Sequence, residues 1–215
     1  MAAVSASIFG SFWVALGLII LLADVRAFRR AGPLRRKRTR VADLEDGRAA
    51  KLVGIVRLGS DTLRAPLSGR SCAGWQVATA ARRLFRWRPV GTTRSAAGFY
   101  LDDGTGEVFV PLDGEVAMDL AVAARARKPK RGRVPGKLEP LISAHVEADD
   151  RPRTYRCDEH MITEGMRVAV YGVFRSRPDK RPESARSYRG RSFCFVAETD
   201  AAEGVHVSDD RATLG

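Results

Sequence analysis

The sequence from residue 98 to residue 110 reads GFYLDDGTGEVFV, and this stretch decides the expected fold. Two apolar runs, at residues 98–101 and 107–110, flank a turn at residues 102–106. The turn contains Asp, Gly and Thr, which tolerate positive φ angles or cap their own backbone, so the stretch predicts a β-hairpin. We expect this hairpin to belong to a small Greek-key barrel of the oligonucleotide-binding (OB) type.

Two adjacent carboxylates open the turn and allow two interpretations. Asp102 and Asp103 could bind a cation, but carboxylates at a tight turn usually accept hydrogen bonds from backbone N–H groups. We therefore predict no metal site and assign a structural role in the turn to Asp103, Gly104 and Gly106. These glycines are not followed by a Lys-Ser/Thr pair, so they do not indicate a phosphate-binding loop.

Short strand-like segments recur on both sides of the hairpin. We expect strands at residues 51–58, from Cys72 to Trp87, at residues 166–174 and at residues 192–196. Residues 116–122 fit a strand or a short helix, residues 138–146 fit a short helix, and residues 125–136 fit a basic loop. The pattern predicts a mainly β fold with minor α, as a small OB-like β-barrel or a sandwich domain.

The composition is that of a globular protein. The chain has 215 residues, of which 45% are hydrophobic and 29% are charged, and this balance excludes global disorder. The net charge is +12, but eight positive charges and no acid lie between residues 26 and 40. The rest of the chain is therefore only mildly basic.

The N-terminal segment predicts a membrane anchor. Val4 to Ala23 contains twenty residues without a charge, and a helix of this length matches a hydrocarbon core of about 30 Å. A cleaved signal peptide would carry a positive charge before a shorter apolar run, and here the first basic residue follows the run. The alternative to one N-terminal transmembrane helix is a buried core helix.

The basic cluster after this segment predicts an orientation. The positive-inside rule places it in the cytoplasm, so we expect the cell (inner) membrane, with the N-terminus outside and the soluble domain cytoplasmic. Three widely spaced cysteines agree with a reducing compartment. The cluster is either a topology signal or a site for anionic lipid. The residues expected at the membrane surface are Arg26, Arg29, Arg30, Arg35, Arg36, Lys37, Arg38 and Arg40.

Four groups of residues carry a family resemblance through their order and spacing. They are Gly54-x-Val56; Leu63-x-Ala65-Pro66-Leu67-Ser68-Gly69-Arg70-x-Cys72; Phe99-x-Leu101-x-Asp103-x-Thr105-Gly106 with Val108-x-Val110-Pro111; and Glu159-x-x-Ile162-x-x-Gly165-x-x-Val168-x-Val170-x-Gly172. Together they resemble the GIDE or "beside a membrane" (BAM) domain of MULAN/MAPL-type membrane-anchored RING ubiquitin ligases and of prokaryotic proteins.

The resemblance implies a domain organisation and a class of function. We expect a transmembrane anchor at residues 1–25, a basic juxtamembrane linker at 26–48, a GIDE/BAM-like β-rich domain at 49–198 and a disordered tail at 199–215. The implied function is a single-pass membrane protein that presents a cytoplasmic binding or scaffold domain. Membership of a ubiquitin-ligase-like system follows from the family resemblance alone.

The zinc ligands of a RING finger are missing from this sequence. A RING needs about eight Cys and His ligands for two zinc ions, whereas the chain has three of each. Cys157-x-x-His160 is the only pair at ligand spacing, and the histidines are scattered without a nucleophile elbow. We therefore predict no catalytic residues, no metal and no cofactor, and favour a protein that is not an enzyme.

A basic and aromatic stretch offers an alternative function. Arg82, Arg83, Arg86, Trp87 and Arg88 interleave guanidinium groups with an aromatic ring, and residues 125–133 add further basic groups. Such a pattern suits nucleic acid or anionic lipid. It also suits a strand end whose ring packs on the core while the arginines stay in water. We expect membrane lipid and other proteins as partners, and favour nucleic acid less.

Overall fold

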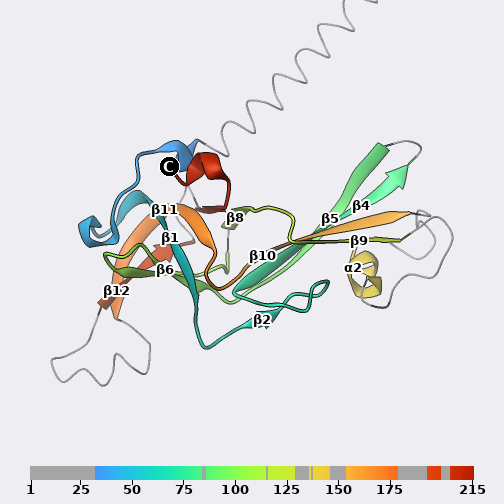
Figure 1. The fold of residues 1–215 in the computed structure, drawn as a ribbon, viewed down its shortest axis with the longest axis horizontal. Coiled ribbons are helices and arrows are strands. Elements are labelled where there is room, and N and C mark those ends of the chain that lie inside the picture. The colour runs from blue at the N-terminus through green and yellow to red at the C-terminus, as the bar shows by residue number, and fades with distance from the viewer. Residues whose placement is uncertain are drawn as a thin grey trace, which may run out of the picture.

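A five-stranded barrel forms the centre of the fold. The structure is a computed structural model that describes residues 32–83, 86–114, 116–128, 136, 138–145, 154–178, 193–199 and 204–215. The barrel strands are β1 (Arg48–Leu58), β6 (Phe99–Asp102), β7 (Glu107–Val110), β11 (Arg167–Pro178) and β12 (Phe193–Glu198). Their order is β1-β6-β7-β12-β11, and the pairing of β11 with β1 closes the ring. Figure 1 shows the barrel on the left.

Strand directions and side-chain alternation confirm an OB-like barrel rather than a sandwich. β7 and β12 pair in parallel, and the other neighbours in the ring pair antiparallel. The predicted hairpin forms β6 and β7, with Asp102 opposite Glu107. Its inward side chains are Phe99, Leu101, Val108 and Val110, and all four are fully buried. Alternate residues therefore fill the barrel interior, as a small closed barrel requires.

Two strands extend the barrel sheet beyond β11. β13 (Val205–Ser208) pairs antiparallel with β11, and β8 (Val116–Asp119) pairs in parallel with β13. The two possibilities left open for residues 116–122 are thereby resolved in favour of a strand. The disordered tail expected at residues 199–215 differs from the structure, because Val205 and Val207 are fully buried in the core.

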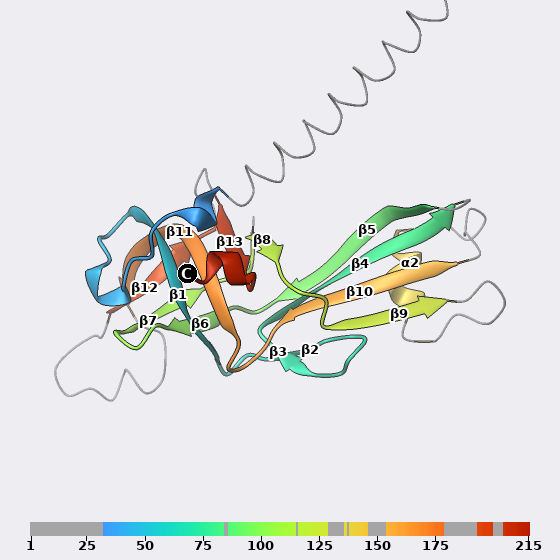
Figure 2. The ribbon, with the colours of Figure 1, turned by 45° about the horizontal axis from the view of Figure 1, so that its top comes forward.

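A second sheet is inserted into the connections of the barrel. Its strands are β4 (Gly74–Arg83), β5 (Arg86–Ala96), β9 (Ala124–Lys128) and β10 (Tyr155–Ile162), in the antiparallel order β5-β4-β10-β9. The short hairpin of β2 (Leu63–Arg64) and β3 (Ser71–Cys72) precedes β4. Figure 2 shows this sheet at the opposite end of the elongated molecule from the barrel. β9 occupies part of the stretch expected as a basic loop, so that expectation is corrected for residues 125–128.

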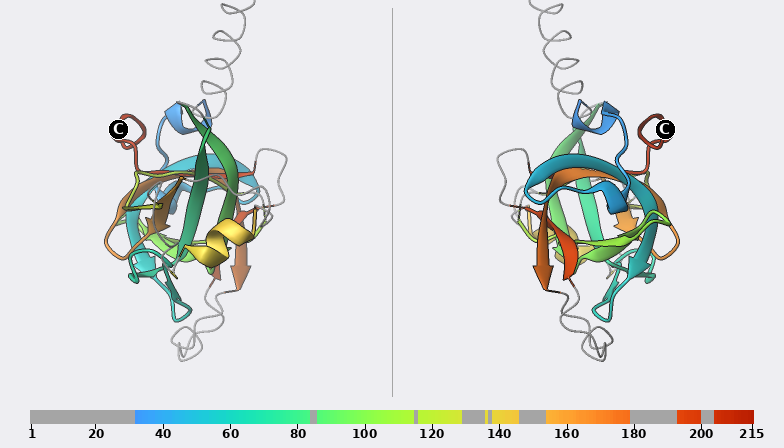
Figure 3. Two further views of the ribbon diagram at one scale, coloured as in Figure 1. Left: turned by 90° about the vertical axis from the view of Figure 1, so that its right-hand side faces the viewer. Right: turned by 90° about the vertical axis from the view of Figure 1, so that its left-hand side faces the viewer.

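One face of the second sheet is covered by helix α2 (Glu139–Ser143), which confirms the short helix expected at residues 138–146. Figure 3 shows α2 lying across the end of the sheet. Leu138, Leu141 and Ile142, from the helix and its N-cap, pack on the sheet residues Val77, Ala81, Tyr155 and Cys157. Because β-strand side chains alternate between faces, the intervening residues of β4 and β10 point away from α2.

The expected linker contributes to the fold on the outside of the barrel. The 3-10 helix η1 (Pro33–Arg35) lies beside η5 (Arg211–Thr213) near the C-terminal end of the chain (Figure 1). Leu34 and Leu214 pack with Val53, Ala169 and Tyr171 on the outer side of β1 and β11. A second turn, η2 (Val41–Asp43), buries Val41 in the main core.

The predicted transmembrane helix requires a correction. A helix needs about twenty apolar residues to cross a bilayer. Within the described ranges the longest helix has five residues, and none is long and apolar enough to span a membrane. The segment in which the helix was expected, Val4 to Ala23, lies outside those ranges.

Closure of the barrel requires a glycine at residue 54. β1 pairs with β11 up to Ile55 and with β6 from Ile55 onward, so it bends beside Gly54. A Cβ atom at residue 54 would lie 2.5 Å from the Asp102 carbonyl oxygen. We predict that Gly54→Ala lowers the free energy of unfolding by about 3 kcal/mol, because backbone has to move. Urea denaturation of the full chain measures this change.

A matched glycine at the end of the same strand serves as the control. A Cβ atom at Gly59 would meet only the Tyr100 ring, at 3.6 Å, which is ordinary contact. We expect Gly59→Ala to change the unfolding free energy by less than about 1 kcal/mol. Equal effects of the two substitutions would contradict the role of the close approach at residue 54.

Candidate binding surface

The face of the second sheet opposite α2, which no described element covers, carries a concentration of arginines. Cross-strand register places alternate residues of the four strands on this face, which we call the open face. Its charged residues are Arg82, Arg94, Arg125, Arg127, Arg156 and Asp158. Five positive groups therefore face one carboxylate among the described residues of this surface.

A hollow of about 310 Å³ lies in the open face. Ala78 and Ala80 form part of its floor, and their small side chains leave room above the sheet. The β4–β5 register shifts between Thr79 and Ala80, so that β5 carries one extra residue at this point. Trp87 and Pro89 of β5 supply apolar parts of the lining on this face, while Arg156 and Asp158 supply the polar part.

Charged groups at the hollow are linked to one another. Asp158 is only 8% exposed and accepts hydrogen bonds from Arg125, at 2.5 Å from Nε and 3.3 Å from Nη2. The Arg156 Nε atom lies 3.0 Å from Asp158 Oδ2, the oxygen that accepts the hydrogen bond from Arg125 Nη2. The Arg156 guanidinium also lies over the Trp87 ring, 5.2 Å from the ring centroid. These contacts hold Arg156 and Trp87 in place. They also neutralise the Asp158 carboxylate, so the surface around it is positive.

Part of this surface was predicted from the sequence. Arg82 and Trp87 are direct cross-strand partners on the open face. Arg88 instead pairs with Ala81, whose side chain faces α2, and Arg86 pairs with Arg83 at the strand ends. The second basic stretch contributes Arg125 and Arg127 through β9, so the structure brings the two predicted stretches to one sheet.

Other residues of this surface were missed by the sequence analysis. Arg94, Arg156 and Asp158 come from strands that had not been assigned or whose orientation was unknown. The only signal in the sequence is the alternation of Arg156, Asp158 and His160 along β10, which places three polar groups on one side of a strand. That signal could not reveal which residues of β4, β5 and β9 lie beside them.

The barrel presents a different surface where β6 and β7 face outward. Tyr100 and Phe109 are cross-strand partners there, with ring centroids 5.1 Å apart. OB folds commonly bind oligonucleotides or oligosaccharides over the corresponding strands. Asp102 and Glu107 lie on the same outward side, and the nearby Arg57 pairs with Asp102 and Glu164. The local charge therefore disfavours phosphate at this surface.

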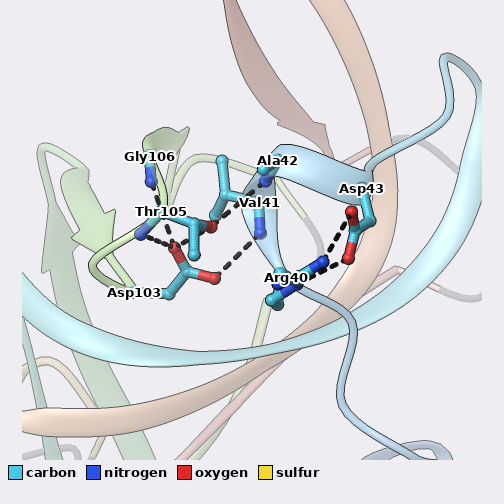
Figure 4. Close-up of polar contacts among 7 residues, drawn as sticks. All are labelled: Arg40, Val41, Ala42, Asp43, Asp103, Thr105 and Gly106. Carbon is cyan, nitrogen blue, oxygen red and sulfur yellow. Dashed lines mark hydrogen bonds and ion pairs between the residues drawn. The ribbon is translucent and has the colours of Figure 1, made fainter.

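The Asp103 turn holds the N-terminal segment against the barrel, as Figure 4 shows. One carboxylate oxygen of Asp103 accepts hydrogen bonds from the Thr105 hydroxyl at 2.7 Å and from the N–H groups of Thr105 and Gly106. The other accepts the Val41 N–H group at 2.8 Å. Gly104 adopts a φ of +84°, and Gly106 leaves space for the Val41 side chain. The turn thus joins two distant segments.

The proposed membrane-surface residues divide into two sets. Arg26, Arg29 and Arg30 lie outside the described residues. Arg35, Arg36, Lys37, Arg38 and Arg40 are exposed on the barrel. Arg36 lies over the Tyr171 ring, 5.0 Å from its centroid, and Arg40 forms an ion pair with Asp43 (Figure 4). These contacts attach the basic segment to the folded domain.

The described thiols and imidazoles contact structural partners. Burial raises the pKa of the thiols of Cys72 and Cys157, and both cysteines are free. His145 bonds Thr93 at 3.0 Å, and the His160 Nδ1 atom lies 2.7 Å from the Leu120 carbonyl oxygen. Within the described part of the chain, no group of three or more His, Cys, Asp or Glu side chains is arranged to hold a metal ion.

A buried carboxylate anchors the loop between β2 and β3. Glu159 is fully buried and accepts hydrogen bonds from the N–H groups of Leu67 and Ser68, at 2.7 and 3.1 Å. The loop begins at Ala65, which is also buried. These contacts explain why two of the sequence groups quoted above lie together in space, although about ninety residues separate them. The carboxylate acts here as a structural acceptor.

Comparison with known proteins identifies one family. The model of the family GIDE, described as E3 ubiquitin ligase, matches residues 77–203, which is more than half of the chain. The matched region contains all four strands of the open face except the first residues of β4. Neither the comparison with curated proteins nor the comparison with solved structures found a match.

The hydrogen bonds of Asp103 generate a prediction about acid stability. Burial alone would raise the pKa of this carboxyl, but the bonds from Thr105, Val41 and Gly106 together hold its pKa below the ordinary value. A depressed folded-state pKa stabilises the protein above the unfolded-state pKa, and this contribution is lost as the pH falls through the folded-state value. We predict that Asp103→Asn costs about 1–2 kcal/mol of unfolding free energy at pH 7. The difference from the parent should shrink below about pH 4.

Urea denaturation at pH 7 and pH 3 measures both parts of this prediction. Asp113→Asn serves as the control, because Asp113 is exposed and follows the same barrel hairpin. We expect the control to remain close to the parent at both values. A deficit of Asp103→Asn that stays constant with pH would show that the ionised carboxylate has no special role.

Proposed function

The chain belongs to the GIDE family of E3 ubiquitin ligases, and we propose that it serves a ubiquitin-ligase-like system as a non-catalytic binding or scaffold module. The observation that carries this proposal is the open face of the second sheet. It combines five arginines with a hollow next to Trp87, which suits recognition of an anionic partner. The partner in this proposal is another protein with an acidic surface.

The residues available for ubiquitin transfer support a non-catalytic role. A RING would need about eight Cys and His ligands, and these 215 residues contain three of each. A thioester mechanism would need an accessible thiolate. Cys72 and Cys157 are buried, and burial raises the pKa of both thiols, so these two cysteines are poor nucleophiles at neutral pH. Our proposal includes no cofactor.

A second candidate function involves the basic segment on the barrel. Arg35, Lys37 and Arg38 are exposed there, and each basic residue near an anionic membrane surface contributes about 1 kcal/mol. We propose that this segment contacts lipid headgroups on the cytoplasmic side of a membrane. Nucleic acid is the less favoured ligand, because the outward face of the OB-like barrel carries Asp102 and Glu107.

The first test concerns ubiquitin transfer. We predict that the purified full chain, incubated with ubiquitin, its activating enzyme and a panel of conjugating enzymes, forms no ubiquitin chains and does not accelerate thioester discharge. A gel-based discharge assay with a RING ligase as the positive control measures this. Discharge that depends on the chain would refute the non-catalytic role, and Cys194→Ser would then show whether the remaining, half-buried thiol is responsible.

The second test locates the partner-binding surface. We predict that the double variant Arg82→Glu/Arg127→Glu reduces partner recovery at least tenfold, because it reverses two charges on the open face. A photo-crosslinking residue at position 80, at the hollow, should capture the same partner. Mass spectrometry of the material from native cells compares the partner recovered with the parent and with the double variant, and identifies the partner crosslinked at position 80.

Two exposed arginines outside the open face provide the matched control. Arg64 lies in β2 and Arg167 in β11, so Arg64→Glu/Arg167→Glu changes the net charge by the same amount. We expect this variant to keep its partners. Equal losses for the two variants would indicate a nonspecific charge effect and contradict the proposal. Binding of the chain to vesicles containing phosphatidylserine is measured separately, and it should not change with the open-face variant.

A further inference from the structure

The hollow and the adjacent sheet edge together specify a kind of partner. We propose that β5 binds an extended acidic segment of a protein, which adds to the sheet as a strand and places one large apolar side chain in the hollow. This inference rests on the proposed binding function and narrows its partner to a peptide in β conformation. Three independent features of the described residues support it.

The first feature is the position of β5 in its sheet. In the order β5-β4-β10-β9, β5 has a strand neighbour on one side only. Figure 2 shows it along the outer edge of the sheet. An edge strand presents backbone N–H and C=O groups to which an extended peptide can add. Residues 91–96 provide six consecutive positions without a proline, whereas Pro89 lacks an N–H group and limits the pairing on the other side.

The second feature is the charge of this edge strand. β5 carries Arg86, Arg88 and Arg94 and contains no acidic residue. Directly opposed side chains of antiparallel strands interact, and opposite charges stabilise the pair. Of these three, Arg94 lies within residues 91–96, so an added strand gains from Asp or Glu beside it. Arg86 and Arg88 lie beyond Pro89 and add to the positive charge along the same edge. Arg82, on the neighbouring strand, adds a further positive group on the open face.

The third feature is the hollow itself. Five of its lining residues, Trp87, Pro89, Val90, Gly91 and Thr92, belong to β5. Every second side chain of an added strand would point over the open face, at intervals of about 7 Å. One such side chain can reach across β5 into the hollow, which is large enough for an aromatic ring and has an apolar wall formed by Trp87 and Pro89.

The same features distinguish a peptide from a nucleic acid. A nucleic acid can stack on Trp87 and contact the arginines, but it cannot continue the backbone ladder of a sheet. Single-stranded nucleic acid on this surface is thus the alternative outcome of the experiment.

The experiment selects ligands from a display library of random ten-residue peptides on the purified full chain. We expect the enriched peptides to contain at least two Asp or Glu residues and one large apolar residue. Methylation of alternate backbone nitrogens in an enriched peptide should weaken its binding at least tenfold, because this change removes edge hydrogen bonds and keeps every side chain. Fluorescence polarisation measures these affinities.

Protein variants separate the contributions of charge and hollow. Arg82→Glu/Arg94→Glu, which reverses two charges of the open face, should weaken binding of the enriched peptide at least tenfold, and Ala80→Trp should do so by filling the hollow. The control Arg64→Glu/Arg167→Glu should bind like the parent. Hydrogen exchange should show added protection of the backbone amides at residues 91–96 when peptide is bound. Circular dichroism establishes that each variant is folded.

Several outcomes would overturn this inference. Enriched peptides without acidic residues, or no enrichment beyond that on an unrelated protein, would exclude an acidic peptide. Unchanged affinity after backbone methylation would exclude strand addition. Tighter binding of single-stranded RNA than of any peptide would identify the alternative ligand. In each case a partner crosslinked at position 80 would still support the broader binding function, so the two proposals can fail separately.

Discussion

The close approach of two backbones at Gly54 is the constraint on which the rest of the fold depends. β1 must pair with β11 along its first part and with β6 along its last part, and this change of partner closes the barrel. The backbone of Asp102 occupies the space that a side chain at residue 54 would need. The next residue, Asp103, binds the Val41 N–H group. Closure of the barrel and attachment of the N-terminal segment are therefore consequences of one local geometry.

The open face depends on the barrel for its position. β5 runs into β6 after two residues, and β10 runs into β11 after four. The second sheet thus continues directly from two barrel strands. Its hydrophobic face is covered by a helix of only five residues and by the loop that Glu159 holds. Helix α2 and this loop pack on one face of the sheet only, which is why the hydrophobic residues are buried there while the arginines lie on the opposite face.

The sequence predicted the barrel well because its signals are local. The Asp-Gly-Thr-Gly turn specifies a hairpin by itself, and the alternation at residues 166–174 identifies the long strand β11. The open face was predicted only in part, because it combines alternate residues from four strands that are distant in the chain. Arg82 and Trp87 were grouped because they are close in the sequence, yet nothing local could place Arg125 beside Asp158. The strand β9 was missed because its Arg and Lys residues belong to the same basic, Pro- and Gly-containing sequence, residues 125–136, that predicted a loop.

Two surfaces of opposite character explain why an OB-like fold need not bind nucleic acid here. The outward side of β6 and β7 retains an aromatic pair, but Asp102 and Glu107 accompany it. The arginines of the open face lie instead on the inserted sheet, and the edge strand β5 of that sheet has no acidic residue. An insertion of this kind can change the ligand chemistry without altering the barrel, because its strands are not those that form the barrel. The function is therefore better inferred from the charges of the insertion than from the fold that supports it.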